Sequence, residues 1–549
     1  MTTEITKDYN GYPDVPGITP ENFELGEGGI SLNQYNKAQE ELKNYAEKQQ
    51  ATFLGYQTNQ NIDYSIYAPY LKCLFNNIGD PFTSGNFTMN TKFMERMVLD
   101  YFARLWHAET PHVDIDPENP QTNESYWGYV VSMGSSESNV FGLWNARDYL
   151  AGRELLVDDD AAKEAKLASE QNPGVLYSAK PRVIVSDPVA PEDNPNYYTP
   201  IAFYSQDTHY SVVKSMRALN IKTFYEEAMN NHYVCPLKWP DDYPEGYPEP
   251  LPGFYPKEVP SNPDGTICIT SLVKLVASFV EMGYPVIISL NYGTTFKGAY
   301  DDVESIVNEL NAHELLKKAE IDDDPVTGTK RKRNNFWIHV DGALSASYAP
   351  YLINGEKASW KLPNFDFAIP EVCSVLMSGH KFPGAPWPCG VFMTRTKYQL
   401  EPPANPHYLG SPDSTFAGSR NGFSAMILWD YIAKNSKTDL TEKATKAERM
   451  AAYLEQQLRK VQEQPQMPDD IWVERTPNSI TVHFKKMADD LVFKYSLSSE
   501  IVYVNGEQRE YNHIFCMDHV DEALIDQLIA DVLAHPNPFP EQHLNDVTE

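Results

Sequence analysis

The sequence predicts an α/β fold built on a mostly parallel sheet. The chain has 549 residues, which suits one large α/β domain with appendages, or two to three domains. Between about 125 and 435, short apolar runs typical of buried strands alternate with segments of helical periodicity. Strands and helices that alternate in this way form parallel sheets, which bind ligands at the carboxyl ends of their strands.

The expected elements follow one another through this region. The strand-like runs are 182–186, 201–205, 285–291, 336–341, 374–378 and 390–395. The helical segments are 139–152, 210–219, 267–282 and 303–318. A stretch with nine prolines, 236–263, interrupts the alternation, which then resumes. We therefore interpret this stretch as an excursion from the domain rather than a linker between domains.

We expect three parts in the chain. Residues 1–110 are polar with short helical patterns, and residues 111–435 form the large α/β domain. Residues 436–549 form a small α+β C-terminal domain, because a long amphipathic helix (440–462) precedes a hairpin-like region and a closing helix (520–534).

The composition argues against several partners. A net charge of −31 disfavours nucleic acid and anionic membranes. The sequence contains no apolar run of 18 residues and no signal-peptide pattern. Its six cysteines form no CxxC pair. We expect a cytoplasmic protein with reduced thiols and with neither a nucleic-acid nor a membrane partner.

Two segments offer groups for a flat, anionic ligand. Ser135 and Ser136 open a helix after a β-rich run, where hydroxyls and free N–H groups bind anions; the alternative is a plain N-cap. His209 follows the run 201–205, and its ring could stack on a ligand, carry a proton, or only form hydrogen bonds.

Thr294 and Thr295 follow the run 285–291 and place hydroxyls at the same sheet edge, unless they only form a turn. His339 and Asp341 lie on one side of a strand, because strand side chains alternate. Two ligands are too few for a metal site, so we expect no metal. A carboxylate buried at a strand end needs a cationic or N–H partner, such as a protonated ring nitrogen.

Lys381 lies between an apolar run, 374–378, and a Gly/Pro turn. It is either a surface lysine or a desolvated amine nucleophile. Together, the anion site, the flat histidine, the aspartate and the amine meet the requirements of pyridoxal 5′-phosphate (PLP). We therefore predict that PLP is the cofactor and that Lys381 holds its aldehyde.

The ordered motifs resemble those of the group II PLP-dependent amino-acid decarboxylases of fold type I, the aspartate-aminotransferase-like fold. The matching segments are NNIGDPF (76–82), GSSESN (134–139), THYSVVK (208–214), NYGTTFKGAYDD (291–302), HVDGAL (339–344), SGHKF (378–382), PCGV (388–391) and GSRNG (418–422). They cover roughly residues 75–435. The family often has GGT at Gly134–Ser136 and a histidine at Phe423; the first difference keeps hydroxyl groups, and the second removes a polar group.

The resemblance implies a role for each matching residue. Asp341 pairs with the pyridine nitrogen, His209 stacks on the ring and Ala343 packs on the other face. The phosphate is held by Ser135, Ser136, Ser378 and His380, with Ser419 reaching it across a homodimer interface. Thr294 or Thr295 contacts the ring hydroxyl or the substrate carboxylate.

The resemblance also implies a mobile lid over residues 405–420, with Tyr408 as the residue that protonates the substrate carbon after CO₂ leaves. The N-terminal segment contributes to the dimer and lines the substrate pocket, where Phe53, Tyr56 and Gln57 offer apolar and amide groups without a positive charge. A glutamate or aspartate substrate would need an arginine there.

The motifs are most similar to the branch that acts on valine, leucine and methionine. We predict decarboxylation of a neutral, aliphatic L-amino acid to the amine and CO₂. Histidine or an aromatic amino acid is the alternative substrate. A fold-type-I aminotransferase is less favoured, because no C-terminal arginine motif is evident. A desulfurase using Cys389 is less favoured, because Cys389 adjoins an apolar strand. A PLP-free binding protein is less favoured, because the lysine, aspartate and histidine occur together.

Overall fold

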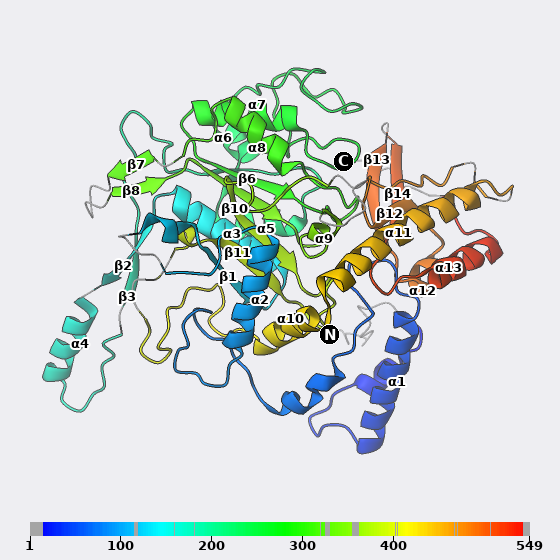
Figure 1. The fold of residues 1–549 in the computed structure, drawn as a ribbon, viewed down its shortest axis with the longest axis horizontal. Helices are drawn as coiled ribbons and strands as arrows, with labels where there is room; N and C mark the ends of the chain where they lie inside the picture. The colour runs from blue at the N-terminus through cyan, green and yellow to red at the C-terminus, as the bar shows by residue number, and fades with distance from the viewer. Residues whose placement is uncertain are drawn as a thin grey trace, which may run out of the picture.

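A seven-stranded sheet forms the centre of the large body in the computed structural model (Figure 1). Its strands, in spatial order, are β1 (Tyr126–Val131), β11 (Gly390–Arg395), β10 (Val372–Ser378), β9 (Phe336–Asp341), β6 (Val286–Asn291), β4 (Ile201–Phe203) and β5 (Lys222–Thr223). Strands β10, β9, β6, β4 and β5 run parallel, and β11 is antiparallel to both of its neighbours. The structure confirms the predicted α/β fold with a mostly parallel sheet.

The structure describes residues 15–541, except 115–118, 159, 181, 319, 324–329, 354–361, 401, 403–404, 466, 469 and 505–506. Among the helices it describes, none combines the length and the apolar character that a membrane crossing requires.

Helices cover the sheet because its strands are apolar on both faces and their side chains are fully buried. Helix α3 (Ser135–Leu150) lies across the sheet and contacts β1, β6, β9, β10 and β11. The other helices of this body are α2 (Lys92–Leu105), α5 (Tyr210–Leu219), α6 (Phe224–Asn231), α7 (Ile269–Glu281), α8 (Val303–Ala312), α9 (Ala349–Ile353) and α10 (Gly422–Lys434). The short 3-10 helices are η1 (Pro20–Phe23), η2 (Ser65–Lys72), η3 (Pro120–Glu124) and η4 (Thr396–Tyr398).

The parallel strands bring distant residues to one edge of the sheet. Asn291 ends β6 and pairs in register with Asp341, which ends β9. Ser378 ends β10 and pairs with Gly390 at the start of β11. Because Val131 at the end of β1 also faces Gly390, the loop that leads into α3 arrives at the same edge.

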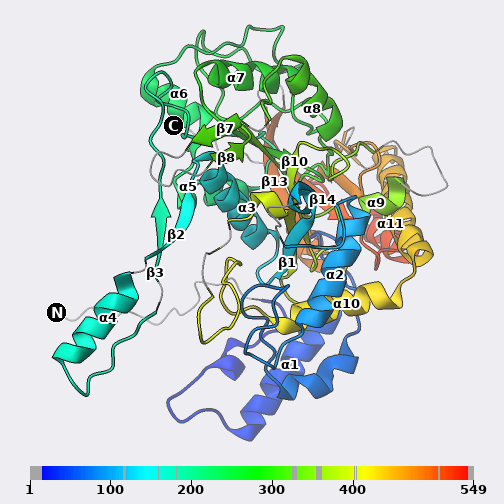
Figure 2. The same cartoon turned by 60° about the vertical axis from the view of Figure 1, so that its left-hand side comes forward.

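The prediction that residues 182–186 belong to the central sheet is wrong. This run forms strand β3 (Arg182–Ser186), which pairs with β2 (Glu154–Asp158) in a separate antiparallel ribbon. The ribbon and helix α4 (Asp160–Gln171) project from the body as an arm (Figure 2). Ile184 at the centre of β3 is 50% exposed, so this apolar strand does not enter the core. A second small ribbon pairs β7 (Glu320–Asp323) with β8 (Lys330–Arg333).

The C-terminal region is an α+β unit with its own apolar core. Its sheet has the order β12 (Thr481–Lys485), β14 (Glu507–Phe515) and β13 (Ser498–Val504). Its helices are α11 (Lys437–Gln462), α12 (Asp489–Lys494) and α13 (Glu522–Ala534). Leu454, Phe484 and Leu528 are fully buried in this core.

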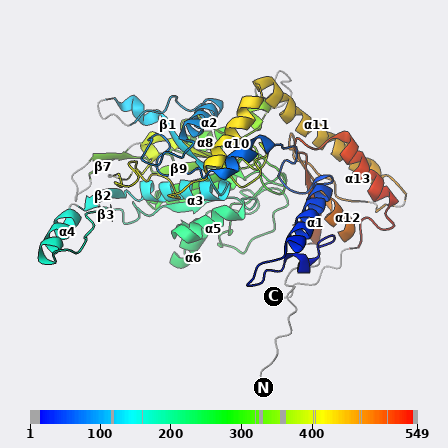
Figure 3. The ribbon, with the colours of Figure 1, turned by 90° about the horizontal axis from the view of Figure 1, so that it is seen from below.

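Helix α1 (Leu32–Gln50) lies beside the C-terminal helices (Figure 3). The chain that follows α1 is fixed to the C-terminal unit by backbone hydrogen bonds. Leu54 donates its N–H to Tyr495 O (3.0 Å), and Leu54 O accepts from the N–H of Phe515 (3.0 Å). The N-terminal segment is therefore packed on the C-terminal unit before it reaches the large body.

Candidate active site

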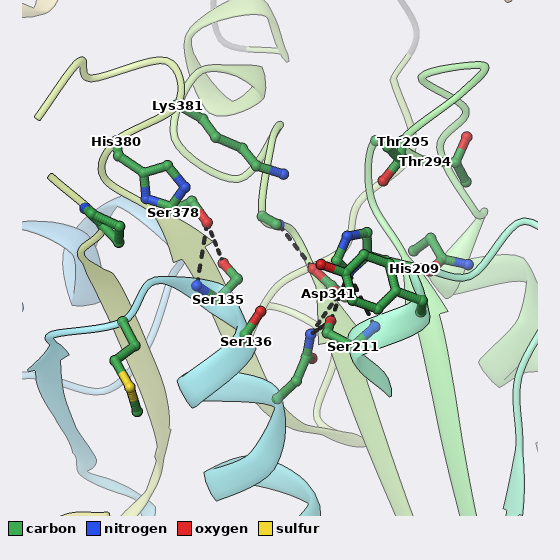
Figure 4. Close-up of a pocket in the computed structure, with 17 residues that line it drawn as sticks. Ser135, Ser136, His209, Ser211, Thr294, Thr295, Asp341, Ser378, His380 and Lys381 are labelled. Carbon is green, nitrogen blue, oxygen red and sulfur yellow. Dashed lines mark hydrogen bonds between the residues drawn. The ribbon is translucent and has the colours of Figure 1, made fainter. Parts of the chain in front are cut away.

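A cavity of about 270 Å³ opens at the carboxyl ends of the central strands (Figure 4). This volume is near the lower end of small-ligand pockets, roughly 300–1,000 Å³. The predicted site residues that line it are Ser135, Ser136, His209, Thr294, Thr295, Asp341, Ala343, Ser378, His380 and Lys381. The structure therefore brings these predicted residues together at the carboxyl ends of the strands.

One end of the cavity is rich in hydrogen-bond donors for an anion. Ser135 and Ser136 open α3 after Gly134, which adopts a φ of +68° that glycine tolerates at little cost. The hydroxyls of Ser135 and Ser378 lie 2.7 Å apart, and the N–H of Ser135 points at Ser378 Oγ (3.3 Å). Hydroxyls and N–H groups at a helix N-terminus favour a phosphate or another anion.

Lys381 extends its amine toward the middle of the cavity (Figure 4). Burial lowers the pKa of Lys381 to about 8, although the nearby Asp341 opposes this shift. Within the part of the chain that the structure describes, no hydrogen bond or salt bridge involves its Nζ, and only burial and the charge of Asp341 act on its pKa. An amine that is buried, unpaired and partly neutral near pH 8 is suited to nucleophilic chemistry.

We expect the lowered pKa of Lys381 to control how fast the apoprotein captures PLP. Only the neutral amine carries the lone pair that attacks an aldehyde, so the rate should rise with pH through about 8. Stopped-flow absorbance between about pH 6.5 and 10 would measure this rate. A rate that rises only near pH 10, where an ordinary lysine loses its proton, would contradict the assignment.

Asp341 lies on the floor of the cavity with fixed hydrogen-bond donors. Its Oδ1 accepts from the N–H of Ala343 (3.1 Å), and its Oδ2 accepts from Asn139 Nδ2 (2.8 Å). The side chain is 6% exposed. A carboxylate held in this way can still accept one more hydrogen bond from a cationic N–H group in the cavity.

His209 begins α5 as its N-cap, and its ring lies beside Asp341 (Figure 4). Its Nδ1 accepts from the N–H of Ser211 (3.2 Å) and lies 2.7 Å from Ser211 Oγ. Burial lowers the pKa of His209 from its ordinary value, with Asp341 opposing that shift. The histidine is therefore a neutral, orientated ring at the cavity wall.

Thr294 and Thr295 also line the cavity, in the turn that follows β6. Thr294 Oγ1 accepts from the N–H of Ala299 (3.0 Å), so Thr294 stabilises the turn. Gly293 in this turn has a φ of +97°, and a Cβ there would lie 2.1 Å from Ser345 Oγ. The turn therefore requires glycine at this position.

Five predicted residues do not line the cavity within one chain: Phe53, Tyr56, Gln57, Tyr408 and Ser419. Gln57 is nearby, because its Nε2 donates to Thr295 O (3.4 Å). Two residues later, Asn59 donates its N–H to Lys381 O (3.2 Å). The N-terminal segment thus reaches the cavity rim, whereas Tyr408 is 67% exposed on the surface.

Sequence reasoning missed several residues of the cavity: Met133, Asn139, Tyr210, Ser211, Asn291, Gly293 and Pro388. Asn139 follows Ser135 by one helical turn, so helical spacing could have placed it on the same face. Asn291 ends β6 beside Asp341, and the rule that had located Asp341 would also have found it.

The residues present fit PLP on the chemistry of their side chains. The cavity combines hydroxyl and N–H donors at a helix N-terminus, an unpaired buried amine, a carboxylate and a neutral imidazole ring. Cys389 does not belong to this set, because its thiol is buried and burial raises its pKa to about 12, which makes the thiolate scarce.

Comparisons with known proteins agree with this chemistry. A family model described as "Pyridoxal-dependent decarboxylase conserved domain" matches residues 252–475. The crystal structure of L-methionine decarboxylase from Streptomyces sp. 590, complexed with L-methionine methyl ester, is 38% identical in sequence. That match covers 96% of this chain and 99% of that chain, with a TM-score of 0.80.

Curated relatives extend the comparison to other substrates. Histidine decarboxylase from Solanum lycopersicum is 26% identical over 92% of this chain and 88% of the relative. Serine decarboxylase 2 from Oryza sativa subsp. japonica is 27% identical, and the match covers 75% of this chain and 62% of that relative's length. The chain therefore belongs to the pyridoxal-dependent decarboxylase family, within the group II amino-acid decarboxylases of PLP fold type I.

Proposed function

We propose that this PLP-dependent amino-acid decarboxylase acts on a neutral, aliphatic L-amino acid of the methionine, leucine or valine type. The observation that carries the proposal is the likeness to the Streptomyces L-methionine decarboxylase, at 38% identity over 96% of this chain. The histidine and serine decarboxylases found by sequence are 25–27% identical. Histidine or an aromatic amino acid is the second candidate.

The charges at the cavity support a neutral substrate side chain. Among the described residues that line it, the ionisable groups are Asp341, Lys381, His209, His380 and Tyr210. None is an arginine that would pair with a side-chain carboxylate. Asp341 already accepts two hydrogen bonds, and the nearby Gln57 is neutral.

Each residue would have a defined task around the cofactor. Bound PLP supplies the electron sink for the pair of electrons left when the bond between Cα and the carboxylate breaks. Lys381 would hold the aldehyde, and Asp341 would keep a proton on the ring nitrogen. His209 and Ala343 would pack on the two ring faces. The phosphate would be held by Ser135, Ser136, Ser378 and His380.

The walls would orient the substrate. Thr294 or Thr295 would donate a hydroxyl to the substrate carboxylate or to the ring hydroxyl. Holding the bond between Cα and the carboxylate perpendicular to the ring is what selects decarboxylation over transamination. Phe53, Tyr56 and Gln57 would form the wall around the substrate side chain, and Tyr408 would return a proton to Cα.

A substrate panel tests the reaction and the specificity together. Purified protein with PLP would be offered methionine, leucine, valine, histidine, aromatic amino acids, serine and glutamate, and both CO₂ and amine would be measured. Amine from the aliphatic group alone supports the proposal. Amine from histidine or an aromatic amino acid overturns the substrate assignment, and a keto acid without CO₂ overturns the reaction.

We expect Gln57→Ala to raise KM for the aliphatic substrate about 2- to 10-fold, the loss of one neutral hydrogen bond or packing contact. Turnover should change little, because Gln57 reaches the cavity rim rather than the reacting atoms. Gln60→Ala is the matched control, since Gln60 belongs to the same segment and donates to Thr58 Oγ1. An unchanged KM for Gln57→Ala would remove this residue from the substrate pocket.

We also propose a homodimer with shared active sites. Large apolar side chains are exposed on η2 and α2, with Leu71 at 69% and Phe93 at 64%. An apolar surface of this kind in a single chain is typical of a subunit interface. Ser419, whose hydroxyl accepts from Asn76 Nδ2 (3.0 Å), is the residue proposed to reach the partner's phosphate. Sedimentation of the holoenzyme would measure its mass.

The thiols support the proposed cytoplasmic location. All six cysteines are free, and Cys373, Cys389 and Cys516 are buried thiols whose pKa is raised by burial. Such a set suits a reducing compartment.

A further inference from the structure

A chain of buried side chains runs from the interior of the sheet to the floor of the cavity. Trp337 and His339 lie on β9 on the same side as Asp341, because strand side chains alternate. Ser374 on the neighbouring β10 pairs in register with His339, and Asn139 on α3 contacts His339 and Asp341 of β9. Trp337, His339 and Ser374 have no measurable exposure.

The donors and acceptors of this chain leave one consistent assignment. Trp337 Nε1–H only donates, and it donates to Ser374 Oγ (3.0 Å). If the Ser374 hydroxyl accepted from both rings, its own O–H would have no acceptor among the described residues, so it donates to His339 Nδ1 (2.7 Å). His339 is left with its proton on Nε2, which it donates to Asn139 Oδ1 (2.8 Å). Burial lowers the pKa of His339 to about 4, which agrees with a neutral ring.

The orientation of the Asn139 amide determines its hydrogen bonds to Asp341 and Ser211. Because its Oδ1 accepts from His339, its amide N–H groups must point the other way. One donates to Asp341 Oδ2 (2.8 Å) and the other to Ser211 Oγ (3.0 Å). Ser211 Oγ lies 2.7 Å from His209 Nδ1 and can only donate to it, since His209 Nδ1 already accepts from an N–H group.

The contact between Asn139 and His339 also requires α3 to pack closely on β9. Gly142 follows Asn139 by three residues on the same helix. A Cβ at position 142 would lie 2.8 Å from His339 Cε1. Glycine therefore lets the helix approach His339 closely enough for Asn139 to reach its ring.

We propose that Asn139 is a positioning residue, held by the Trp337–Ser374–His339 chain, that fixes both the Asp341 carboxylate and the tautomer of His209. The inference rests on the proposed pairing of Asp341 with the cofactor's ring nitrogen. If the amide flipped, its oxygen would face the carboxylate and repel it. The hydrogen bonds of Trp337, Ser374 and His339 therefore keep the Asp341 carboxylate in place as the negative group that holds the proton on the ring nitrogen.

The first test compares Asn139→Leu with Asn145→Leu in the holoenzyme. Asn145 lies on the same helix and is also buried; it donates to Phe141 O (3.0 Å), accepts from the N–H of Leu400 (3.3 Å) and does not line the cavity. Asn139→Leu should lower kcat about 10- to 100-fold, a barrier increase of about 1.4–2.7 kcal/mol, with a smaller change in KM. The ¹⁵N resonance of ¹⁵N-labelled PLP should lose its protonated shift in Asn139→Leu and keep it in Asn145→Leu.

The second test changes Ser374, which does not line the cavity, and it does not require Asn139 variants to fold. Ser374→Val and Ser374→Thr have the same shape and differ by one hydroxyl. We expect Ser374→Val to shift the ¹⁵N resonance and lower kcat, and Ser374→Thr to restore both. The proposal is overturned if Ser374→Val and Ser374→Thr give the same ¹⁵N resonance and the same kcat. It is also overturned if the resonance is unchanged in both Asn139→Leu and Ser374→Val. An unprotonated ring nitrogen in the unaltered enzyme would instead overturn the role of Asp341 itself.

Discussion

Replacing Lys381 with alanine is expected to lower the rate of decarboxylation by about 1,000-fold or more, as the removal of a nucleophile does in other enzymes. The amine of Lys381 lies in the cavity, and burial lowers its pKa to about 8. No other lysine lines the cavity among the described residues, so none can take its place. The protein should also lose the visible absorbance of covalently held PLP.

The fold should survive this substitution. Within the described part of the chain, Nζ of Lys381 has no hydrogen bond to lose. Lys92 is the matched control, because burial also lowers its pKa to about 8. Its Nζ, however, donates to Asp80 O (2.7 Å) and Thr83 O (2.8 Å), so its role is structural.

Lys92→Ala should therefore lower the melting temperature and leave bound PLP attached. Lys381→Ala should leave the melting temperature of the apoprotein unchanged and abolish the covalent attachment of PLP. Thermal unfolding, borohydride trapping of PLP on the chain and CO₂ release would separate the two outcomes. Activity of Lys381→Ala within about tenfold of the unaltered enzyme, a barrier change of only about 1.4 kcal/mol, would disprove the assignment of Lys381.

The part of the site that the sequence predicts is the part carried by local signals. Ser378 and Asp341 end apolar strands, and Thr294 lies three residues after another such strand. Parallel strands bring such positions to one sheet edge whatever their separation in sequence. Lys381 is found by the same rule. The order of elements in the large body follows from the same alternation of apolar strands and helices.

What the sequence could not provide depends on pairing between distant segments. Strand β3 has the apolar composition of a buried strand, and only its pairing with β2 reveals that Ile184 is half exposed. Asn139 lies on a helix whose start was predicted, but its partners Asp341 and His339 are about 200 residues away in sequence. Only the folded structure combines these residues into one network.

The GSRNG motif shows that a sequence motif does not reveal which of its residues is buried. The prediction concerned Ser419, but the buried residue of the motif is Arg420, which forms an ion pair with Glu95 and donates to Gly79 O (3.0 Å). Both partners are almost fully buried, at 1% and 0% exposure of their side chains. An arginine in a loop motif gives no sign, in sequence, of whether its partner is a ligand or a carboxylate of the protein.

Tyr408→Phe is expected to lower the rate of amine formation about 100- to 10,000-fold, the usual contribution of a positioned general acid. The substitution removes only the hydroxyl, so PLP attachment should be unchanged. In a single turnover, CO₂ should appear before the amine, because carbon–carboxylate cleavage precedes protonation of Cα. Tyr210→Phe, which removes a hydroxyl from the cavity wall, is the matched control. CO₂ and amine appearing together at the unaltered rate would exclude Tyr408 as the proton donor.

The position of Tyr408 leads to a sharper test. Its ring lies 5.5 Å from Lys180 Nζ on the surface, outside the cavity of its own chain. To act as the proposed proton donor, Tyr408 would have to move with its loop or serve the site of a second copy. A purified heterodimer of one Lys381→Ala chain and one Tyr408→Phe chain distinguishes these cases.

If Tyr408 serves the partner's site, the Tyr408→Phe chain keeps Lys381 and receives an intact Tyr408 from the other chain. One of the two sites is then complete, and the heterodimer should recover about half of the unaltered activity. If Tyr408 serves its own chain, each site lacks either the lysine or the tyrosine, and the activity should stay at or below that of the Tyr408→Phe homodimer. Recovery would establish the shared active site, because two defective chains can complement each other only when one site takes residues from both.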